Sequence, residues 1–195
     1  AYASRSDVVV LALPRGGVPV AAEVAARLGA PLDVFLVRKL GVPGHPELAM
    51  GAIAEGGVMV VSNAILADLG IPRAALDQVA ARERLELERR DVQYRGGRER
   101  PSVRDKVVIL IDDGLATGAT MEAAVMALRE HQPARIVVAT PVGARDACER
   151  LGQVADEVIC ALIPASFMAV GQWYQDFGQT SDDEVKALVE QAGVR

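Results

Sequence analysis

The sequence predicts a doubly wound, mostly parallel α/β sheet with a small C-terminal hood, in one domain spanning residues 1–195. Short apolar runs rich in Val, Ile and Leu recur along the chain, and such runs are typical of strands covered on both faces. Helical patterns separate several of these runs, which is the alternation that βαβ units produce. The 195 residues, 51% hydrophobic and 24% charged, are enough for one substantial core.

Each expected element follows from a local pattern. Strands are predicted at the apolar, β-branched runs, which cover residues 7–13, 32–40, 106–113, 135–142 and 154–163. Helices are predicted between them, at residues 18–29, 120–131 and 143–152. Gly29 should end the first helix in the left-handed conformation, and Thr120 should be the N-cap of the second. The core should therefore extend over about residues 5–160.

Residues 41–62 break the alternation because they are rich in Gly and Pro around two short strand-like runs, LAMGAIA and VMVV. We expect a mobile loop at 41–47 and then a hairpin, both inserted after the second strand. His45 is the only side chain of this loop that can carry a positive charge.

Residues 72–95 are predicted to form a long charged helix. Oppositely charged residues lie four apart and should pair on a solvated face, as in Arg82/Glu86, Arg84/Glu88 and Glu86/Arg90. The strongly basic stretch 95–104 should then be a solvated connection into the next strand. As a minor alternative, Arg95 or Arg98 would reach a phosphate group in the same or a neighbouring subunit.

Charge and cysteine content exclude several classes of function. A net charge of −5 gives no reason to expect nucleic acid or an anionic membrane surface as a partner. Cys148 and Cys160 have neither zinc-site nor redox-motif spacing, and no apolar run is long enough to span a bilayer. We therefore expect a cytoplasmic protein that acts on small molecules. The chain starts without Met, which leaves open that an N-terminal segment is missing.

Polar residues gather where the predicted strands end. Arg15-Gly16-Gly17 follow the first strand, Arg38-Lys39 close the second, and Asp112-Asp113 follow the third. The carboxyl ends of parallel strands meet at one edge of a sheet, and this edge is where open α/β sheets bind ligands. The sequence therefore predicts a ligand site made from these three groups.

The segment 112–120 has the composition of a ribose-phosphate site. Its residues after Asp113 are small or hydroxylated, so backbone N–H groups can approach an anion at the start of the following helix. Thr117 and Thr120 add hydroxyl donors. Two adjacent carboxylates would repel a phosphate, but they can accept hydrogen bonds from the two vicinal hydroxyls of a ribose.

Residues 111–120, IDDGLATGAT, resemble the 5-phosphoribosyl 1-pyrophosphate (PRPP) signature of type I phosphoribosyltransferases. The resemblance implies transfer of the 5-phosphoribosyl group from Mg²⁺-complexed PRPP to a nitrogen of a nucleobase-like acceptor, with release of pyrophosphate. It also implies a homodimer. In this family Asp112 and Asp113 would bind the ribose, and the 5′-phosphate would lie on Ala116, Thr117, Gly118, Ala119 and Thr120.

The resemblance also assigns the polar residues after the first two strands. PRGG, residues 14–17, stands where the family has its pyrophosphate loop, so Arg15, Gly16 and Gly17 are expected on pyrophosphate. Arg38 and Lys39 match the basic pair that the family uses on the leaving group. The alternative for Arg38 and Lys39 is a pair of solvated charges at a strand end.

The catalytic residues expected from the resemblance are Arg38, Lys39, Asp112 and Asp113. The transition state should resemble an oxocarbenium ion. Residues 41–47 occupy the position of the family's mobile active-site loop, although they lack the Lys or Arg that some members carry there.

Residues 161–185 resemble the hood with which purine-type members cover the base. Trp173 or Tyr174 would then stack on the acceptor, and Asp176 would contact Mg²⁺ or the base. The alternative is that these aromatic residues only pin the segment to the core. Ala116 stands where members acting on 6-oxopurines have an acid, so the resemblance does not fix the acceptor.

Two other classes of function remain as alternatives. A non-catalytic regulatory module would bind PRPP or a nucleotide with the same residues. A dinucleotide or nucleoside triphosphate site is disfavoured, because neither Gly-x-Gly-x-x-Gly nor Gly-x-x-x-x-Gly-Lys-Ser/Thr occurs in the sequence.

Overall fold

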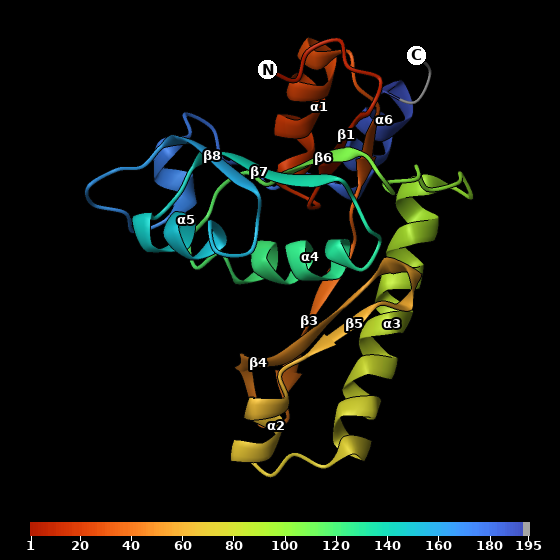
Figure 1. The fold of residues 1–195 in the computed structure, drawn as a ribbon, viewed down its shortest axis with the longest axis vertical. Helices are drawn as coiled ribbons and strands as arrows, with labels where there is room; N and C mark the ends of the chain where they lie inside the picture. The colour runs from red at the N-terminus through yellow and green to blue at the C-terminus, as the bar shows by residue number, and fades with distance from the viewer. Residues whose placement is uncertain (193–195) are drawn as a thin grey trace.

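The computed structural model describes residues 1–192, apart from the Glu47 side chain, and it has the predicted α/β class (Figure 1). The main sheet is parallel, with strand order β2-β1-β6-β7-β8. Its strands are β1 (Val8–Ala12), β2 (Leu32–Val34), β6 (Val107–Ile111), β7 (Arg135–Val142) and β8 (Glu157–Leu162). The order reverses between β1 and β6, and ligands bind at the carboxyl ends of strands beside such a switch point.

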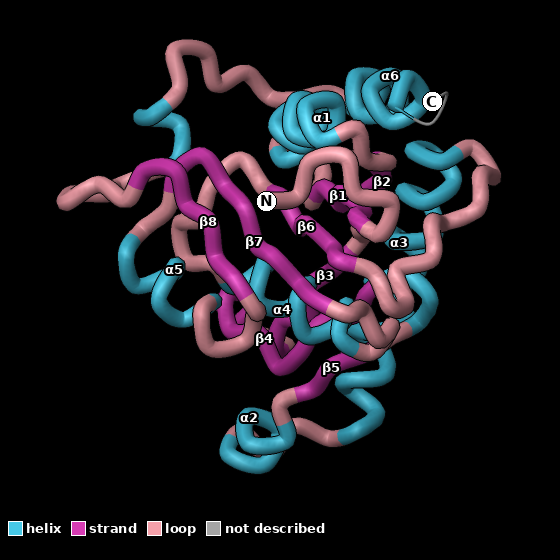
Figure 2. The backbone as a smooth tube through the Cα atoms, turned by 45° about the horizontal axis from the view of Figure 1, so that its top comes forward, coloured by secondary structure: helices cyan, strands magenta, loops and turns pink. Residues whose placement is uncertain are grey.

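Helices cover both faces of the main sheet, as a doubly wound fold requires (Figure 2). One face is covered by α1 (Gly17–Leu28) and α6 (Asp182–Ala192), and the other by α4 (Ala119–Arg129) and α5 (Arg145–Leu151). Val8 and Val10 of β1 pack toward the first layer, and Val9 and Leu11 toward the second. Every residue of β1 is buried, because both of its faces are covered.

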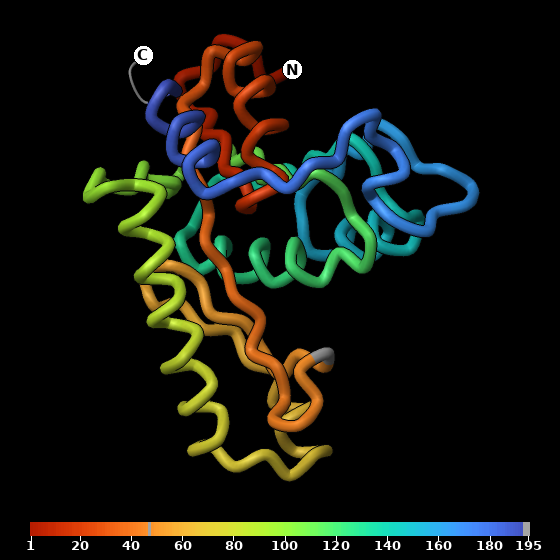
Figure 3. Tube along the Cα trace, turned by 180° about the vertical axis from the view of Figure 1, so that it is seen from behind, coloured from red at the N-terminus to blue at the C-terminus, as the bar shows by residue number. Residues whose placement is uncertain are grey.

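A small antiparallel sheet projects from the main body and, together with α2 and α3, forms what we call the arm (Figure 3). Its strands are β3 (Val37–Val42), β4 (His45–Ala54) and β5 (Met59–Val61). The short helix η1 (Glu55–Gly57) joins β4 to β5, and α2 (Asn63–Asp68) and α3 (Arg73–Arg95) follow. The hairpin predicted after the second strand is therefore confirmed as β4 and β5.

The prediction of one strand over residues 32–40 is wrong, because the chain leaves the main sheet after Val34. Phe35 N–H donates to the Ala12 carbonyl at 2.8 Å, and the next N–H, that of Leu36, donates to the Glu55 carboxylate at 3.0 Å. Residues 37–42 then pair with β4. Residues 41–47, predicted to be a loop, instead comprise the end of β3, a turn and the start of β4.

The long helix predicted at 72–95 is confirmed as α3, and Glu86 pairs with Arg90 at 2.7 Å as expected. Arg82, however, pairs with Glu83 rather than with Glu86. Arg95, the first residue of the segment predicted to be a solvated connection, is instead buried, with only 3% of its side chain exposed.

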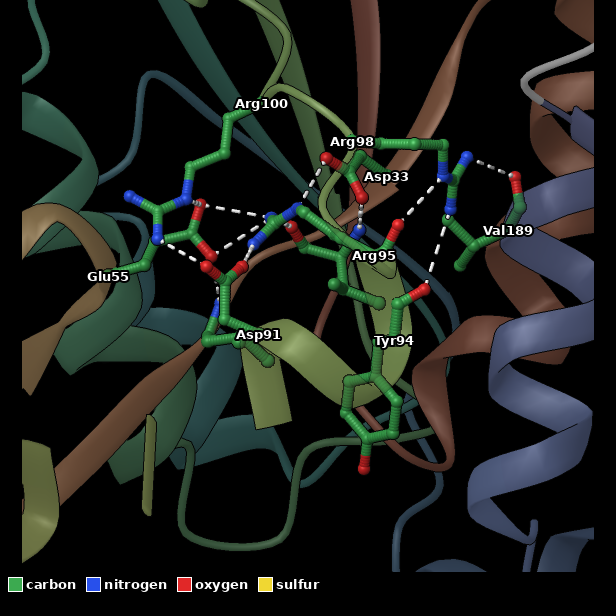
Figure 4. A network of polar contacts seen from close by, with 10 residues as sticks. Asp33, Glu55, Asp91, Tyr94, Arg95, Arg98, Arg100 and Val189 are labelled. Carbon is green, nitrogen blue, oxygen red and sulfur yellow. Dashed lines mark hydrogen bonds and ion pairs between the residues drawn. The ribbon is translucent and has the colours of Figure 1, made fainter. Parts of the chain in front are cut away.

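The Arg95 guanidinium lies inside a cluster of carboxylates (Figure 4). It contacts Asp33 at 2.8 Å, Glu55 at 3.0 Å and also Asp91. Arg98 donates to the backbone carbonyls of Tyr94, Arg95 and Val189 (Figure 4). The alternative in which Arg95 reaches a phosphate is therefore wrong, because Arg95 is buried and paired with carboxylates. For Arg98, which is exposed, the alternative stays a prediction.

The C-terminal part contains a helix that the sequence analysis did not anticipate. The predicted hood begins as an irregular segment with the short helix η2 (Val170–Trp173), and α6 then packs between α1 and α3. Ser181 and Glu184 form a reciprocal capping box, in which Glu184 N–H donates to Ser181 Oγ and Ser181 N–H donates to the Glu184 carboxylate. Among the described residues, every helix is too short or too polar to cross a lipid bilayer.

Candidate functional site

The loop after β1 packs directly against the two acids after β6, as the sequence predicted. A Cβ atom added to Gly16 would lie 2.0 Å from Asp113 Oδ2. One added to Gly17 would lie 2.6 Å from the Ile111 carbonyl oxygen and 2.9 Å from Asp112 Cα. Both glycines are therefore required by close approach, because any side chain would displace the carboxylates or the end of β6.

Burial weakens the acidity of both carboxyl groups. Burial raises the pKa of Asp112 to about 7, and the neighbouring charge of Asp113 adds to the effect. Burial also raises the pKa of Asp113. Asp112 Oδ1 accepts a hydrogen bond of 2.9 Å from the Asp113 backbone N–H, which fixes the orientation of its carboxyl group. The pair has oxygens suited to accepting hydrogen bonds from hydroxyl groups.

The segment after the two acids is anchored through the backbone of Leu115 and the carbonyl of Thr117, and most of its residues are open to solvent. Leu115 is buried, its N–H donates to the Val142 carbonyl at 3.0 Å, and its carbonyl accepts from Ala144 N–H at 2.8 Å. Residues 116, 117, 119 and 120 are exposed. The first N–H groups of a helix have no intrahelical acceptor and carry partial positive charge. The start of α4 can therefore bind an anion.

The N-cap prediction for α4 is wrong by two residues. The helix begins at Ala119, and its N-cap is Gly118 rather than Thr120. Gly118 has φ of 69°, a left-handed conformation that glycine adopts without strain. Thr120 consequently lies in the first turn of the helix, and its side chain is exposed beside the anion site.

Two clefts open beside these residues. The first, which we call the hood cleft, has a volume of about 670 Å³ and lies between the loop after β1 and the hood. Its wall includes Arg15, Gly16, Asp113, Tyr174, Asp176 and Phe177. The second, the arm cleft, has a volume of about 720 Å³ and is lined by Pro14, Arg38, Lys39, Glu83, Arg90 and Thr120 among others. The cations predicted for pyrophosphate are thus divided between two clefts that flank residues 14–16.

Tyr174 connects the hood to the acids. Its hydroxyl donates to the Asp113 backbone carbonyl at 2.6 Å, and its ring lies 5.2 Å from the Phe177 ring, centroid to centroid. Burial, with the nearby charges of Asp113 and Asp112, raises the pKa of Tyr174 to about 12. Trp173 does not line the hood cleft. Of the two predicted stacking residues, only Tyr174 is placed beside Asp113, and Phe177 is an aromatic neighbour that the sequence analysis missed.

The basic residues around the clefts are held by acidic partners. Arg38 forms an ion pair of 2.8 Å with Glu83, whose side chain is only 10% exposed. The Arg15 guanidinium lies 3.8 Å from Asp182 at the start of α6. Arg90 lines the arm cleft with Arg38, although the sequence analysis treated it only as a partner of Glu86. The i,i+4 spacing of Glu86 and Arg90 predicts an ion pair on the helix surface, but it does not predict that Arg90 faces a cleft.

The carboxylates of the hood cleft suit a cation that arrives with its ligand. Among the described residues, no cluster of three or more His, Cys, Asp or Glu side chains could hold a metal ion. Asp113 and Asp176 both line the hood cleft. Mg²⁺ is commonly bound through one or two carboxylates plus substrate phosphates, so these two residues fit such an ion.

A family model described as the phosphoribosyl transferase domain matches residues 1–172. The chain belongs to this family. The resemblance of residues 111–120 to the family's signature pointed to the same family.

Similar proteins agree with this assignment. Two Mycobacterium tuberculosis proteins, from strains CDC 1551 and H37Rv and provisionally named phosphoribosyl transferases, are each 50% identical over 192 residues. The match covers 98% of this chain but 43% of theirs, so the chain spans less than half of the length of these relatives. The bifunctional protein PyrR of Haemophilus ducreyi is 35% identical over 100 residues, which are 50% of this chain and 56% of PyrR.

A solved structure has the same fold as nearly the whole of this chain. The crystal structure of TT1426 from Thermus thermophilus superposes with a TM-score of 0.88 at 46% identity. The superposition covers 96% of this chain and 89% of TT1426.

Proposed function

We propose that this phosphoribosyl transferase domain transfers the 5-phosphoribosyl group from PRPP to a nitrogen of a nucleobase-like acceptor and releases pyrophosphate. The observation that carries the proposal is the direct packing of Gly16 and Gly17 against Asp112 and Asp113, beside the open start of α4. Groups suited to a pyrophosphate, a diol and a phosphate monoester therefore adjoin one another at the switch point of the sheet.

In this proposal the two ends of the ribose 5-phosphate are held by one segment. The vicinal hydroxyls of the ribose donate to the carboxyl groups of Asp112 and Asp113. The 5′-phosphate accepts hydrogen bonds from the backbone of Ala116, Thr117, Gly118, Ala119 and Thr120, and from the two Thr hydroxyls. Arg150 supports this segment, since it donates to the Thr117 carbonyl at 2.7 Å.

The pyrophosphate is assigned to the loop after β1. Arg15 and the N–H groups of Gly16 and Gly17 are the proposed donors. The Arg15 guanidinium lies 3.8 Å from the Asp182 carboxylate, and on binding it would exchange this contact for contacts with phosphate oxygens. Arg38 and Lys39 would add charge from the arm cleft, which Thr120 also borders. Mg²⁺ carried with PRPP would neutralise part of the leaving group's charge, and Asp113 or Asp176 is its proposed protein contact.

The acceptor is assigned to the hood cleft. Tyr174 and Phe177 supply aromatic surface there, and Asp176 supplies a polar contact. The C1′–oxygen bond breaks with its electron pair leaving on pyrophosphate, the acceptor nitrogen bonds to C1′, and the nitrogen's proton passes to solvent. Positive charge develops on the ribose as in glycosidic bond cleavage, so the nearby carboxylates Asp112 and Asp113 stabilise the transition state.

The test is an assay of pyrophosphate release from PRPP with a panel of purine, pyrimidine and other nitrogen acceptors. At least one acceptor should give turnover, and Asp113→Asn should lower kcat/KM by about 100-fold or more, as losing one transition-state contact does. Asp105→Asn is the matched control, because Asp105 is exposed and loses the same charge. Tight PRPP binding without turnover for every acceptor would favour the regulatory alternative, and absence of PRPP binding would contradict the proposed transfer reaction.

A further inference from the structure

Two neighbouring arginines of α3, Arg89 and Arg90, share one acid but differ in the donors that they keep. Both pair with Glu86, at 2.8 and 2.7 Å. Arg89 uses all three of its nitrogens, because Nε and Nη2 donate to Glu86 and Nη1 donates to Gln93. Arg90 donates to Glu86 from Nε, and its two terminal nitrogens make no hydrogen bond within the described residues. Arg90 therefore keeps most of its N–H donors for another acceptor.

The free side of Arg90 belongs to the wall of the arm cleft. Residues three, four or seven apart lie on one face of a helix, and Val79, Glu83 and Arg90 of α3 all line this cleft. β3, which carries Arg38, lines the same cleft and contacts α3. Arg89 is not part of this wall, and 56% of its side chain is exposed, against 27% for Arg90. The two arginines therefore serve different surfaces.

Arg90 lies where the two proposed phosphate-binding segments meet. A small recess adjoins the arm cleft, and the linings of the recess and the cleft share Pro14, Arg38, Arg90 and Thr120. Pro14 begins the loop assigned to pyrophosphate, and Thr120 ends the segment assigned to the 5′-phosphate. A ligand that bridges these two segments would thus pass beside Arg90.

The arm cleft carries an excess of positive charge. Among the described residues, Glu83 is its one acidic lining residue, and this carboxylate is shared by Arg38 at 2.8 Å and Arg82 at 3.0 Å. One carboxylate cannot neutralise two guanidinium groups, and the same holds for Glu86. The cleft therefore favours an anion with more than one negative charge. Its basic lining residues are Arg38, Lys39, Arg82 and Arg90.

From these observations we propose that Arg90 binds the pyrophosphate group of PRPP with its terminal nitrogens, beside Arg38. This inference rests on the proposed function, because it takes PRPP as the ligand. The 5′-phosphate already has the backbone donors at the start of α4, whereas the pyrophosphate gains negative charge when the C1′–oxygen bond breaks. A guanidinium placed there stabilises the leaving group more as the reaction proceeds. The long helix α3 would thus contribute directly to the site.

Arg90→Gln and Arg89→Gln form a matched pair of variants. Each removes one positive charge from α3 and one partner from Glu86, but only Arg90 lines the cleft. By calorimetric titration in the presence of Mg²⁺, we expect the Kd for PRPP and for inorganic pyrophosphate to rise about 10-fold or more in Arg90→Gln. In Arg89→Gln both should stay within about twofold of the wild type.

Ribose 5-phosphate separates binding of the pyrophosphate from support of the fold. It lacks the pyrophosphate group, so both variants should bind it as the wild type does. The inference is overturned if the two variants weaken PRPP binding equally, or if Arg90→Gln weakens binding of ribose 5-phosphate as much as that of PRPP.

The same titrations distinguish this inference from the proposed function. Wild-type protein that binds PRPP, with an unchanged Kd in Arg90→Gln, would contradict the role of Arg90 alone. Wild-type protein that binds pyrophosphate but not PRPP would contradict the transfer reaction, and the pyrophosphate titration of the two variants would still decide whether Arg90 binds this anion.

Discussion

The hydroxyl of Tyr174 donates a hydrogen bond of 2.6 Å to the backbone carbonyl of Asp113, which lies 61 residues earlier in the chain. Tyr174→Phe removes this bond and keeps the ring beside Phe177. We expect the free energy of unfolding to fall by about 0.5–1.5 kcal/mol, the net value of a typical hydrogen bond. The Kd for PRPP should rise about 2- to 10-fold, since Asp113 loses its anchor. Urea unfolding and calorimetric titration measure the two effects.

Tyr2→Phe is the matched control for this change. It also removes a tyrosine hydroxyl that donates to an acceptor, in that case the Glu157 carboxylate at the other end of the sheet. It should leave the Kd for PRPP unchanged. Equal effects of the two variants on PRPP binding would show that Tyr174 acts only through general stability.

The raised pKa of Asp112 predicts an unusual dependence of stability on pH. The pKa of Asp112 is about 7 in the folded protein, against an ordinary value of 3.8 for an unfolded chain. Between these two pH values the folded state therefore binds the proton and the unfolded state does not. Stability from this group is therefore lowest above pH 7 and rises as the pH falls toward 4, by up to about 4 kcal/mol. Asp112→Asn should be more stable than the wild type at pH 8 and should lack this rise.

Urea unfolding between pH 5 and pH 8 gives the free energy of unfolding of the wild type and of Asp112→Asn. The other carboxyl groups titrate in both proteins, so their contributions cancel in the difference between the two free energies. The variant should also bind PRPP more weakly at pH 8, because an ionised carboxylate is a better acceptor for ribose hydroxyls. A wild-type minus variant difference that does not change with pH would contradict the shift.

The local signals in the sequence were enough to place the acids and the small residues around them. Residues 111–120 and the PRGG loop each lie at the end of a short buried strand, and parallel strands bring such ends together whatever the rest of the chain does. It was therefore predictable that Gly16 and Asp113 lie near each other. The close approach between them that the structure shows was not predictable.

The position of Arg38 and Lys39 was not predictable in the same way. Residues 32–42 are nearly continuous in their hydrophobicity, and a pattern of this kind does not mark where the chain leaves one sheet for another. That point is set by long-range contacts, in which Arg95 pairs with Asp33 and Glu55 accepts from the Leu36 N–H. The placing of Tyr174 against Asp113 likewise depends on how the hood crosses the sheet, which a local pattern does not encode.

Gly16→Ala tests the close approach between the two loops. Gly16 has a right-handed helical backbone that Ala adopts freely, so the cost comes only from the Cβ atom placed 2.0 Å from Asp113 Oδ2. Because Asp113 must move, we expect the Kd for PRPP to rise about 10-fold or more. Gly152→Ala is the control, with a similar backbone and a nearest contact of 3.3 Å to the Glu149 carbonyl. Calorimetric titration compares them, and an unchanged Kd in Gly16→Ala would show that Asp113 does not hold the ligand.

Arg95→Met tests whether the buried guanidinium is structural. The change keeps an unbranched side chain but leaves the carboxylates of Asp33 and Glu55 without their cation, and breaking a buried ion pair from one side costs about 3–5 kcal/mol. Arg73→Met breaks an exposed pair with Asp77 and should cost less than about 1 kcal/mol. Urea unfolding at pH 7 measures both losses. The loss for Arg95→Met should shrink at pH 5, because unpaired buried carboxylates then take up protons. The folded fraction should bind PRPP normally, and weaker PRPP binding without loss of stability would return Arg95 to the phosphate site.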